Sequence, residues 1–460
     1  MIDVAIIGAG LSGLAAGIRL AYFDRRVCLF EKHYAYGGLN SYYTLDGREF
    51  DVGLHALTNY VRPEIRTTPL PRLLRQLRIS RDELDLREQR HSEIRFPGRT
   101  LRFTNDPALF QEEVGREFPK ESDRFQRLLE VIRGHDDFRL DAPYQSARAV
   151  LADLLGDPVL MDMLLCPVMY YGSAEEHDMD FSQFVTIYKS VLDEGLARPR
   201  GGVRPLLKTL VRKFRAAGGK LRMQRGVRRI EVERGRAIGV TLENGEFVEA
   251  GVVFSSAGLP ETMKLCPEAA NPKAESNVGR LSFVECFALL DRPPADLGHG
   301  ATIVFFNDAE RFTYARPAEL VDFRSGVVAC PNNYEGHDEA DVGVLRMTWL
   351  ANYDGWSALG GDEYAAAKER SFEDFLDSAE RFVPGIRKHI VARDVFTPRT
   401  IERFTGHLQG AVYGAPRKVR DGRTNVENLY LCGTDQGYLG VIGAMMSGIT
   451  MANLHVLVRE

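Results

Sequence analysis

Three glycines near the start of the chain have the spacing of a turn that binds phosphate. Gly8 and Gly10 lie between an apolar run, Val4–Ile7, and a segment with helical spacing, Leu11–Asp24, and Gly13 lies in the first turn of that segment. In such a strand-to-helix turn the first glycine permits the tight turn, the second lets a pyrophosphate approach the backbone, and the third lets the helix pack closely on the sheet. This pattern predicts a nucleotide-binding site.

The residue that follows the next expected strand supports this prediction. Val27–Phe30 has the composition of a buried strand, and Glu31 stands directly after it. A carboxylate at that position accepts hydrogen bonds from both ribose hydroxyls of an adenine dinucleotide and repels the additional phosphate of NADP. FAD and NAD both fit this part of the sequence. The residues predicted to contact the nucleotide here are Gly8, Ala9, Gly10, Leu11, Ser12, Gly13, Glu31 and Lys32.

Other glycine-rich segments are far apart in the sequence, but one extended cofactor would bring them together. They are Gly37-Gly38, Gly201-Gly202 and the C-terminal segment 433–444. In the last of these, Asp435 and two spaced glycines precede an apolar helix that is expected to start near Val441. A helix N-terminus carries roughly half a positive charge, which stabilises the anionic form of a reduced flavin. The alternative interpretation of this ending is a well-capped terminal helix without a ligand.

The order of these motifs resembles that of the phytoene desaturase, carotenoid isomerase and retinol saturase superfamily of FAD-dependent oxidoreductases, which is related to the amine oxidases. The resemblance covers both ends of the chain and residues 201–258, whereas the middle is much less diagnostic. It implies that Val227 contacts adenine and that Asp435 lies by the ribityl and pyrophosphate region. Val441 and Ile442 then begin a helix directed at the flavin ring. The other residues that it places at FAD are Gly38, Leu39, Asn40, Gly53, Leu54, Gly433 and Gly440.

Two departures refine the resemblance. In many desaturases and amine oxidases an arginine follows the second glycine pair, but Leu39-Asn40 stands there in this chain. The segments 36–43 and 50–55, with Thr397–Thr400 and Gly410–Gly414, are closer to the carotenoid isomerase and retinol saturase branch. Some amine oxidases attach flavin through a cysteine in the loop that corresponds to Gly410–Gly414. Because the sequence has no cysteine in this loop, the FAD is expected to be noncovalent.

His55 is the candidate catalytic residue. The resemblance places the residues after Asp51-x-Gly53 beside the flavin ring, and a histidine transfers protons near neutral pH. The alternative is a histidine that only hydrogen-bonds the backbone. Asp51 is expected to stabilise its turn. A polyene substrate needs little beyond an apolar slot that holds a C–H bond over flavin N5, so few acid-base residues are expected.

An apolar segment in the middle of the chain is the candidate lining of such a slot. Leu160–Tyr171 is largely apolar, and a second group of apolar residues follows it at helical spacing. An ordinary helical core fits the same pattern equally well. The residues of the second group are Phe181, Phe184, Val185, Ile187 and Tyr188.

The elements that must position these residues predict an α/β fold. We expect a Rossmann-like FAD-binding domain of the glutathione-reductase type with an inserted α+β substrate domain. Residues 1–75, 200–262 and 410–460 are assigned to the discontinuous FAD-binding domain, residues 76–199 to a helical substrate or cap region, and residues 263–409 to a sheet-based substrate domain. In the last region the expected elements are strands Ser282–Leu290, Ala301–Phe306 and Val342–Leu350 and a helix over Tyr364–Phe382.

Two local patterns follow the first nucleotide unit. An Asp46-Gly47 turn between two short extended pieces predicts a hairpin over residues 42–52. Four leucines between residues 70 and 77 then form one face of a helix whose other face carries arginines. This amphipathic helix either packs on the core with a solvated face or docks on an anionic membrane surface.

The composition restricts the partners and the location of the chain. A formal net charge of −5 argues against nucleic acid as a partner, and a hydrophobic small molecule is expected instead. The six cysteines are scattered without metal-ligand spacing, so no metal is expected and a reducing cytoplasm is the simplest location. No secretion signal opens the sequence, and the most apolar window, Leu154–Tyr171, is too interrupted to span a bilayer. Peripheral membrane contact stays open, and the oligomeric state is not indicated.

Three functions remain open from the sequence. The first is an FAD-dependent oxidoreductase that acts on a long apolar isoprenoid or polyene by desaturation, saturation or cis–trans isomerisation, with hydride transfer at flavin N5. The second is an amine- or amino-acid-oxidase-like flavoenzyme, although no motif identifies the carboxylate or aromatic cage that an amine needs. The third is a non-catalytic prenyl-binding escort protein that resembles Rab GDP-dissociation inhibitors, which would not need the full glycine set with Glu31 and Asp435. The first agrees best with the motifs.

Overall fold

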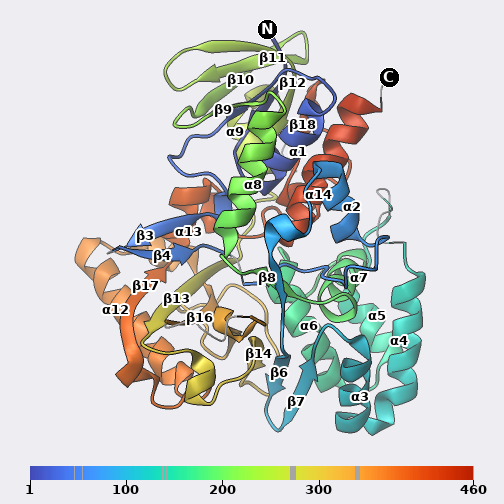
Figure 1. Ribbon diagram of the computed structural model, residues 1–460, viewed down its shortest axis with the longest axis vertical. Helices are drawn as coiled ribbons and strands as arrows, with labels where there is room; N and C mark the ends of the chain where they lie inside the picture. The colour runs from blue at the N-terminus through green and yellow to red at the C-terminus, as the bar shows by residue number, and fades with distance from the viewer. Residues whose placement is uncertain are drawn as a thin grey trace.

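The computed structural model describes residues 1–45, 47–53, 55–136, 139, 142–269, 276–336 and 342–458. Two seven-stranded sheets organise the molecule, one in the upper half and one in the lower half of Figure 1. Segments from the beginning, middle and end of the chain contribute to the upper sheet, so the chain passes between the two halves several times.

The upper sheet is the nucleotide-binding unit that the sequence predicts. Its strands are β1 (Ile2–Ile7), β2 (Val27–Phe30), β9 (Lys220–Arg222), β10 (Val227–Glu233), β11 (Arg236–Leu242), β12 (Phe247–Ser255) and β18 (Leu429–Leu431). β1 lies between β2 and β12, and β9 and β18 join these in parallel, whereas β10 and β11 add an antiparallel extension. The uninterrupted apolar runs of β1 and β2 suit this parallel core, because helices cover one of its faces and the strands β10 and β11 pack against the other.

Three helices cover this sheet: α1 (Leu11–Ala21), α8 (Val203–Ala216) and α14 (Gly440–Ala452). α14 packs tightly on α1, since a Cβ on Gly448 would lie 2.1 Å from the Ser12 carbonyl oxygen. The amphipathic helix α2 (Pro69–Leu77) packs against α14 and α1. Its leucines are buried and its arginines are exposed, which confirms the core-packed interpretation of this helix.

The C-terminal helical stretch Gly440–Leu457 is long and apolar enough to cross a membrane, by length and composition. Half of it is buried inside the protein, where α14 packs on α1 and α2. The sequence pattern singled out Leu154–Tyr171 as the most apolar window instead. In the structure that window contains the shorter apolar helix α6 (Pro158–Gly172).

The lower sheet has the strand order β17-β13-β16-β15-β14-β6-β7. Its strands are β6 (Ser92–Phe96), β7 (Arg99–Phe103), β13 (Ser282–Leu290), β14 (Ile303–Asn307), β15 (Ser325–Ala329), β16 (Gly343–Ala351) and β17 (Ile390–Phe396). The strands β6 and β7 fall in the stretch that the sequence assigned to a helical region, and β6 pairs with β14 in parallel. The predicted boundary between residues 76–199 and 263–409 therefore runs through a continuous sheet.

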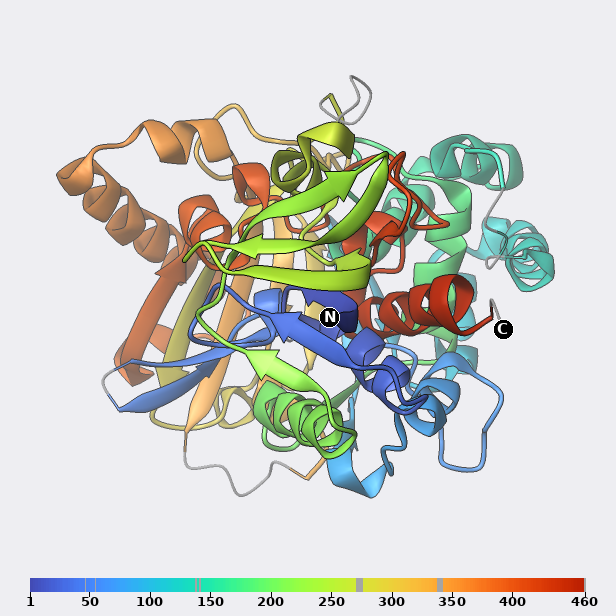
Figure 2. The ribbon, with the colours of Figure 1, turned by 90° about the horizontal axis from the view of Figure 1, so that it is seen from above.

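Helices border the lower sheet on both sides. Figure 2, seen from above, shows α12 on one side of the molecule and α3 to α7 on the other. Their bounds are α3 (Pro107–Glu117), α4 (Ser122–Gly134), α5 (Ala147–Leu154), α6, α7 (Phe181–Tyr188) and α12 (Gly361–Ala379). Asp106, Ser146 and Asp157 cap α3, α5 and α6 by accepting backbone N–H bonds, which explains where these helices begin.

Short elements connect the two halves. The predicted hairpin is present as β3 (Tyr42–Leu45) and β4 (Arg48–Asp51), with Gly47 at a positive φ of 74° in its turn and Asp46 outside the described residues. The remaining elements are β5 (Leu86–Glu88), β8 (Ala197–Pro199), α9 (Leu259–Leu265), α11 (Tyr353–Ala358) and α13 (Pro398–Thr405). The hairpin and α13 lie beside β17, at the edge of the lower sheet (Figure 1).

Candidate active site

A cavity of about 1240 Å³ is lined by residues of both sheets. This volume exceeds the roughly 300–1,000 Å³ of a usual small-molecule site, so the cavity has room for an extended cofactor and a second ligand. Of the residues predicted to contact FAD or to act in catalysis, those that line it are Gly8, Gly10, Leu11, Ser12, Glu31, Lys32, Gly38, Leu39, Asn40, Gly53, His55, Val227, Gly433, Gly440 and Val441. Leu54 lies outside the described residues.

The three N-terminal glycines have distinct surroundings. Gly8 has a φ of +95°, and a Cβ on Gly13 would lie 2.1 Å from the Gly8 carbonyl oxygen, so these two glycines shape the turn and the helix packing. A Cβ on Gly10 would meet no atom within 4 Å, although Gly10 lines the cavity. The turn thus leaves an open space above the backbone at the N-terminus of α1, which fits a pyrophosphate.

Glu31 is held in place by the backbone around it. Its Oε2 accepts a hydrogen bond from Ala9 N at 2.8 Å, and its Oε1 accepts one from His33 N at 2.9 Å. An ionised carboxylate has about four lone-pair sites, so both oxygens can accept a further bond from a ribose hydroxyl. Ala9 itself supplies its amide to Glu31 and does not line the cavity.

The C-terminal motif is divided between the cavity and the core. Thr434 lines the cavity in the segment before α14, and Val441 lines it in the first turn of α14, where the helix N-terminus favours negative charge. Asp435 is 1% exposed and does not line it. Its two oxygens accept backbone N–H bonds from Leu259, at 2.5 Å, and from Ala415, at 2.7 Å.

The position of Asp435 by the ribityl and pyrophosphate region stays a prediction, and in the structure its neighbours Gly433 and Thr434 line the cavity while its own side chain does not. A buried carboxylate requires hydrogen-bond donors, and the two amides supply them. Asp435 thus connects three segments of the chain near the predicted cofactor region. Ile442 and Gly13 are likewise buried behind the cavity wall, and Gly201-Gly202 lines a separate, smaller cavity beside Asp51.

Asp51 fixes the entrance of α8. Its Oδ2 accepts hydrogen bonds from the Arg198 guanidinium at 2.5 Å and from Val203 N at 3.1 Å. The carboxylate caps the helix N-terminus from another part of the chain. Asp51 thus stabilises more than its own turn, because it joins the hairpin to β8 and α8.

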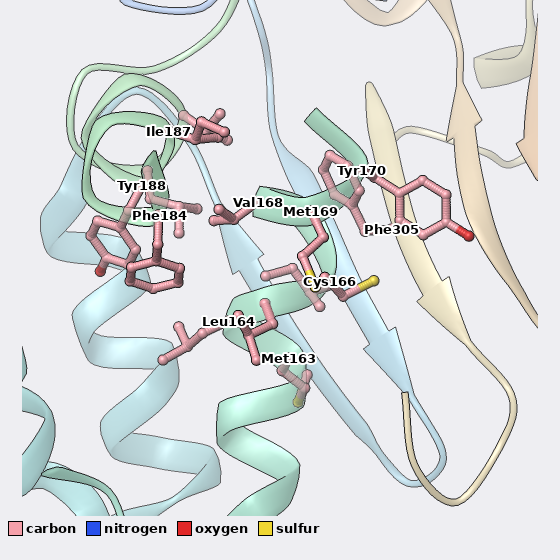
Figure 3. Close-up of a cluster of buried hydrophobic side chains, with 14 of the residues drawn as sticks. Met163, Leu164, Cys166, Val168, Met169, Tyr170, Phe184, Ile187, Tyr188 and Phe305 are labelled. Carbon is pink, nitrogen blue, oxygen red and sulfur yellow. The ribbon is translucent and has the colours of Figure 1, made fainter. Parts of the chain in front are cut away.

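The other part of the cavity is apolar. Its walls come from the lower sheet, from the end of α6 and from two connecting segments near residues 39 and 412, and the residues are Leu39, Tyr170, Tyr171, Phe283, Phe305, Val327, Val412 and Tyr413. Within the predicted slot only Tyr170 and Tyr171 contribute. Figure 3 shows that Phe184, Ile187 and Tyr188 instead pack with α6 in a helical core, which confirms the core interpretation for these residues.

Sequence reasoning missed Phe283, Phe305 and Val327 as part of the site. They stand on buried strands of the lower sheet, where every residue of β13, β14 and β15 is buried. Because both faces of these strands are covered, apolar alternation does not reveal which face borders the cavity. Ser256 and Ala257, which follow β12 and line the nucleotide end, were also missed.

His55 belongs to a polar cluster in this apolar wall. Its Nε2 lies 2.8 Å from Glu285 Oε1, and the same oxygen lies 2.6 Å from Arg346 Nη2. Thr348 Oγ1 is 3.5 Å from His55 Nε2. The His55 carbonyl oxygen also accepts a hydrogen bond from Tyr334 Oη at 3.1 Å. His55 therefore combines a backbone anchor with a side chain that lines the cavity.

The charges in this cluster follow from burial and neighbours. Burial lowers the pKa of His55 below its ordinary value, and the Glu285 carboxylate offsets only part of this effect. Burial raises the pKa of Glu285, but Arg346 and His55 outweigh it and hold that pKa below its usual range. At neutral pH the cluster thus contains a neutral imidazole beside an ionised carboxylate.

The described residues contain no group of three or more histidine, cysteine, aspartate or glutamate side chains that would hold a metal ion. The six cysteines are free and buried in the structure.

The sequence model of the family described as flavin containing amine oxidoreductase matches residues 11–454. The chain is 24% identical to prolycopene isomerase 2 of an Oncidium hybrid cultivar, over 98% of this chain and 83% of that protein. It is 23% identical to all-trans-retinol 13,14-reductase of Danio rerio, over 98% and 86%. Among solved structures, an oxidoreductase from Methanosarcina mazei has a TM-score of 0.69 at 18% identity, over 98% of this chain and 99% of that one. This likeness confirms the predicted fold class.

Proposed function

The chain belongs to the flavin containing amine oxidoreductase family and is an FAD-dependent oxidoreductase, and we propose that its substrate is a long apolar isoprenoid or polyene. The observation that carries this proposal is the cavity lining, in which nucleotide-binding loops continue into walls of aromatic and aliphatic side chains. The proposed reaction is desaturation, saturation or cis–trans isomerisation. Membership of a flavin-containing family argues against the escort-protein alternative, which needs no flavin.

The residues at the nucleotide end would hold FAD. The backbone near Gly10 would receive the pyrophosphate, Glu31 the ribose, and the start of α14 at Val441 the flavin ring. When bound, FAD supplies hydride acceptance and return at N5. The apolar walls contribute by holding a C–H bond of the substrate in a fixed position and by excluding water.

His55 is the proposed proton acceptor. Its neutral imidazole donates Nε2–H to Glu285, so Nδ1 carries the free lone pair. No hydrogen bond joins His55 Nδ1 to any residue that the structure describes. In desaturation the substrate loses a hydride from one carbon and a proton from the next, and Nδ1 takes that proton. The Glu285 carboxylate then stabilises the imidazolium.

The names of the curated relatives support the same substrate class, since one is a prolycopene isomerase and another an all-trans-retinol reductase. An amine substrate agrees less well with the site. Glu285, the carboxylate in the apolar wall, is already paired with Arg346, so its charge is not available to an ammonium group. Leu39-Asn40 also replaces the arginine that many amine oxidases place at the cofactor.

A cytoplasmic location with peripheral membrane contact is part of the proposal. Tyr34, Leu45 and Phe404 line the cavity and are also exposed, by 65%, 39% and 40%. Exposed apolar residues at a cavity mouth suit a surface that receives apolar substrate from a bilayer. Arg403, whose guanidinium lies over the Phe404 ring, complements anionic lipid. Cosedimentation with anionic vesicles tests this contact, and equal recovery of wild type and Phe404→Ser in the pellet would oppose it.

Pigment extraction from a carotenoid-producing host that expresses the chain tests the proposed function. Polyenes with altered double-bond number or geometry are expected. A flavin-free variant such as Gly10→Val serves as the control, because Gly10 borders the cavity without touching other protein atoms. Unchanged pigments in cells that contain FAD-loaded protein would contradict the proposal.

A further inference from the structure

A second polar cluster lines the cavity, at the side of the hairpin. It consists of Tyr43 on β3, Lys368 on α12 and Asp394 on β17, and we call it the hairpin cluster. Tyr43 Oη donates a hydrogen bond to Asp394 Oδ2 at 2.8 Å, and Lys368 Nζ lies 3.7 Å from Asp394 Oδ1. Three elements that are distant in sequence thus place a cation, a carboxylate and a phenol against one part of the wall.

The hydrogen bonding of this cluster is incomplete. A separation of 3.7 Å is too long for a hydrogen bond, so Lys368 and Asp394 are joined by charge alone. No described residue accepts a hydrogen bond from the Lys368 ammonium group, whose side chain is 30% exposed. Asp394 accepts bonds from Tyr43 and from Val395 N, which leaves capacity on its about four lone-pair sites. A donor and an acceptor therefore stand side by side at the cavity.

The chemistry of this pair selects among polar end groups. A hydroxyl accepts from an ammonium and donates to a carboxylate at the same time. A carboxylate would accept from Lys368 but would meet the like charge of Asp394, and a hydrocarbon end would satisfy neither group. We propose that Lys368 and Asp394 bind the hydroxyl of a polyene or isoprenoid alcohol. This inference rests on the proposed function.

The position of the hairpin cluster sets how such an alcohol would lie. Glu285 pairs with Phe396 and Phe287 with Asp394, so Asp394 and Glu285 project from the same face of adjacent strands. Strand spacing and rise place their Cα atoms roughly 8 Å apart. Phe396, which lines the cavity, is the direct partner of Glu285 and lies two residues after Asp394 on β17. The hydroxyl would therefore lie near the His55 and Glu285 cluster, and the bond that reacts would be close to the alcohol end.

The surroundings of the hairpin cluster determine which way the bound alcohol points in the cavity. Leu45, two residues after Tyr43, is exposed and lines the cavity, so the hairpin cluster lies toward the mouth. Phe283 and Phe305 line the apolar part without exposure to the outside. An amphipathic ligand would place its hydroxyl at the mouth and its apolar length inside, where burial of each apolar group is favourable.

Titrations that follow the flavin absorbance of the holoenzyme test this inference. The probes are all-trans-retinol, all-trans-retinoic acid and the corresponding hydrocarbon without the oxygen. Wild type is expected to bind the alcohol about tenfold more tightly than either other probe. Lys368→Met should reduce the affinity for the alcohol to that for the hydrocarbon and leave the affinity for the hydrocarbon unchanged. Lys368→Arg should retain the preference for the alcohol. Lys388→Met, which removes an exposed lysine of the same region, is the matched control.

The outcomes separate the two proposals. The proposed hydroxyl site is wrong if wild type binds the alcohol and the hydrocarbon equally, or if Lys368→Met weakens the binding of all three probes alike. Polyene binding as such would still stand. If none of the polyenes perturbs the flavin, the proposed function fails and this inference fails with it. Asp394→Asn supplies a second check, because removal of the negative charge should improve binding of the carboxylic acid relative to the alcohol.

Discussion

His55 Nε2 lies 2.8 Å from Glu285 Oε1, although 230 residues separate the two in the sequence. The contact joins the loop after the hairpin to the lower sheet, and it places a neutral imidazole next to an ionised carboxylate in the cavity wall. A pair of this kind orients the imidazole and stabilises its protonated form, as in other histidine-based acid-base sites.

His55→Gln should retain FAD and lose turnover. Removal of a general base typically costs about 10²- to 10⁴-fold in rate, and the glutamine keeps a polar side chain against Glu285. Steady-state turnover of a polyene, normalised to bound flavin, measures the effect. Full turnover with normal flavin content would exclude His55 as a catalytic residue.

Glu285→Gln should slow turnover without displacing the cofactor, because the amide orients His55 but does not stabilise the imidazolium. For wild type, kcat/KM should rise with pH through the pKa of His55, which burial places below its ordinary value of 6.5, and stay level above it. The variant should lower this plateau and shift the midpoint further toward acid. An identical profile in both proteins would show that the carboxylate does not act on His55.

Acid should destabilise the folded protein through the same pair. Because the pKa of His55 is lowered on folding, the unfolded chain binds a proton that the folded protein does not, and stability falls as the pH drops below 6.5. The pKa of Glu285 is also lowered on folding, so the protein loses further stability as the pH falls below 4.5, the ordinary pKa of this group. Thermal unfolding between pH 7 and pH 4 measures this slope, which should be smaller in His55→Gln. A variant slope equal to that of wild type would count against the assignment.

Two glycines offer a matched pair that separates binding from folding. Gly10→Val should leave the unfolding temperature of the flavin-free protein nearly unchanged and abolish FAD binding, since its side chain would occupy only the open space in the turn. Gly13→Val should lower stability itself, because a Cβ there would lie 2.1 Å from the Gly8 carbonyl oxygen. Calorimetry together with flavin absorbance measures both. Retention of FAD by Gly10→Val would contradict the predicted pyrophosphate position.

Asp435→Ala should lower the stability of the apoprotein more than it lowers the affinity for FAD. It leaves the amides of Leu259 and Ala415 buried without an acceptor, at a cost of about 1–3 kcal/mol for each. Chemical denaturation of the apoprotein measures the loss. A stable apoprotein that no longer binds FAD would instead support the direct cofactor contact that the motif implied.

The predictions from sequence succeeded where the signal is local. Gly8, Gly10 and Gly13 with Glu31 define a turn whose geometry depends on neighbouring residues alone, and the structure has the strands and helix that they imply. The hairpin and the amphipathic helix α2 are equally local. Each of these features is recognisable without knowledge of distant contacts.

Features that depend on distant contacts were not predictable. Glu285 gains its role only because β13 brings it to His55, and β6 joins β14 across about half of the chain. Asp435 matched a motif, but its orientation is decided by two amides from other segments. The sequence also does not specify which side of a fully buried strand borders a cavity.

Noncovalent attachment of the cofactor is predicted, because the loop Gly410–Gly414 contains no cysteine. Denaturation by heat or acid should release all of the flavin, and chromatography of the supernatant should identify it as FAD. Yellow colour that stays with the precipitated protein would show a covalent bond.

Anaerobic mixing of the oxidised holoenzyme with polyenes and, separately, with amines tests the central claim most directly. Flavin absorbance and chromatography of the polyene are followed together, so that redox reactions and isomerisation are both detected. The account predicts that a polyene changes its double-bond number or geometry while amines leave the flavin oxidised. Flavin reduction by an amine, with every polyene recovered unchanged, would contradict it.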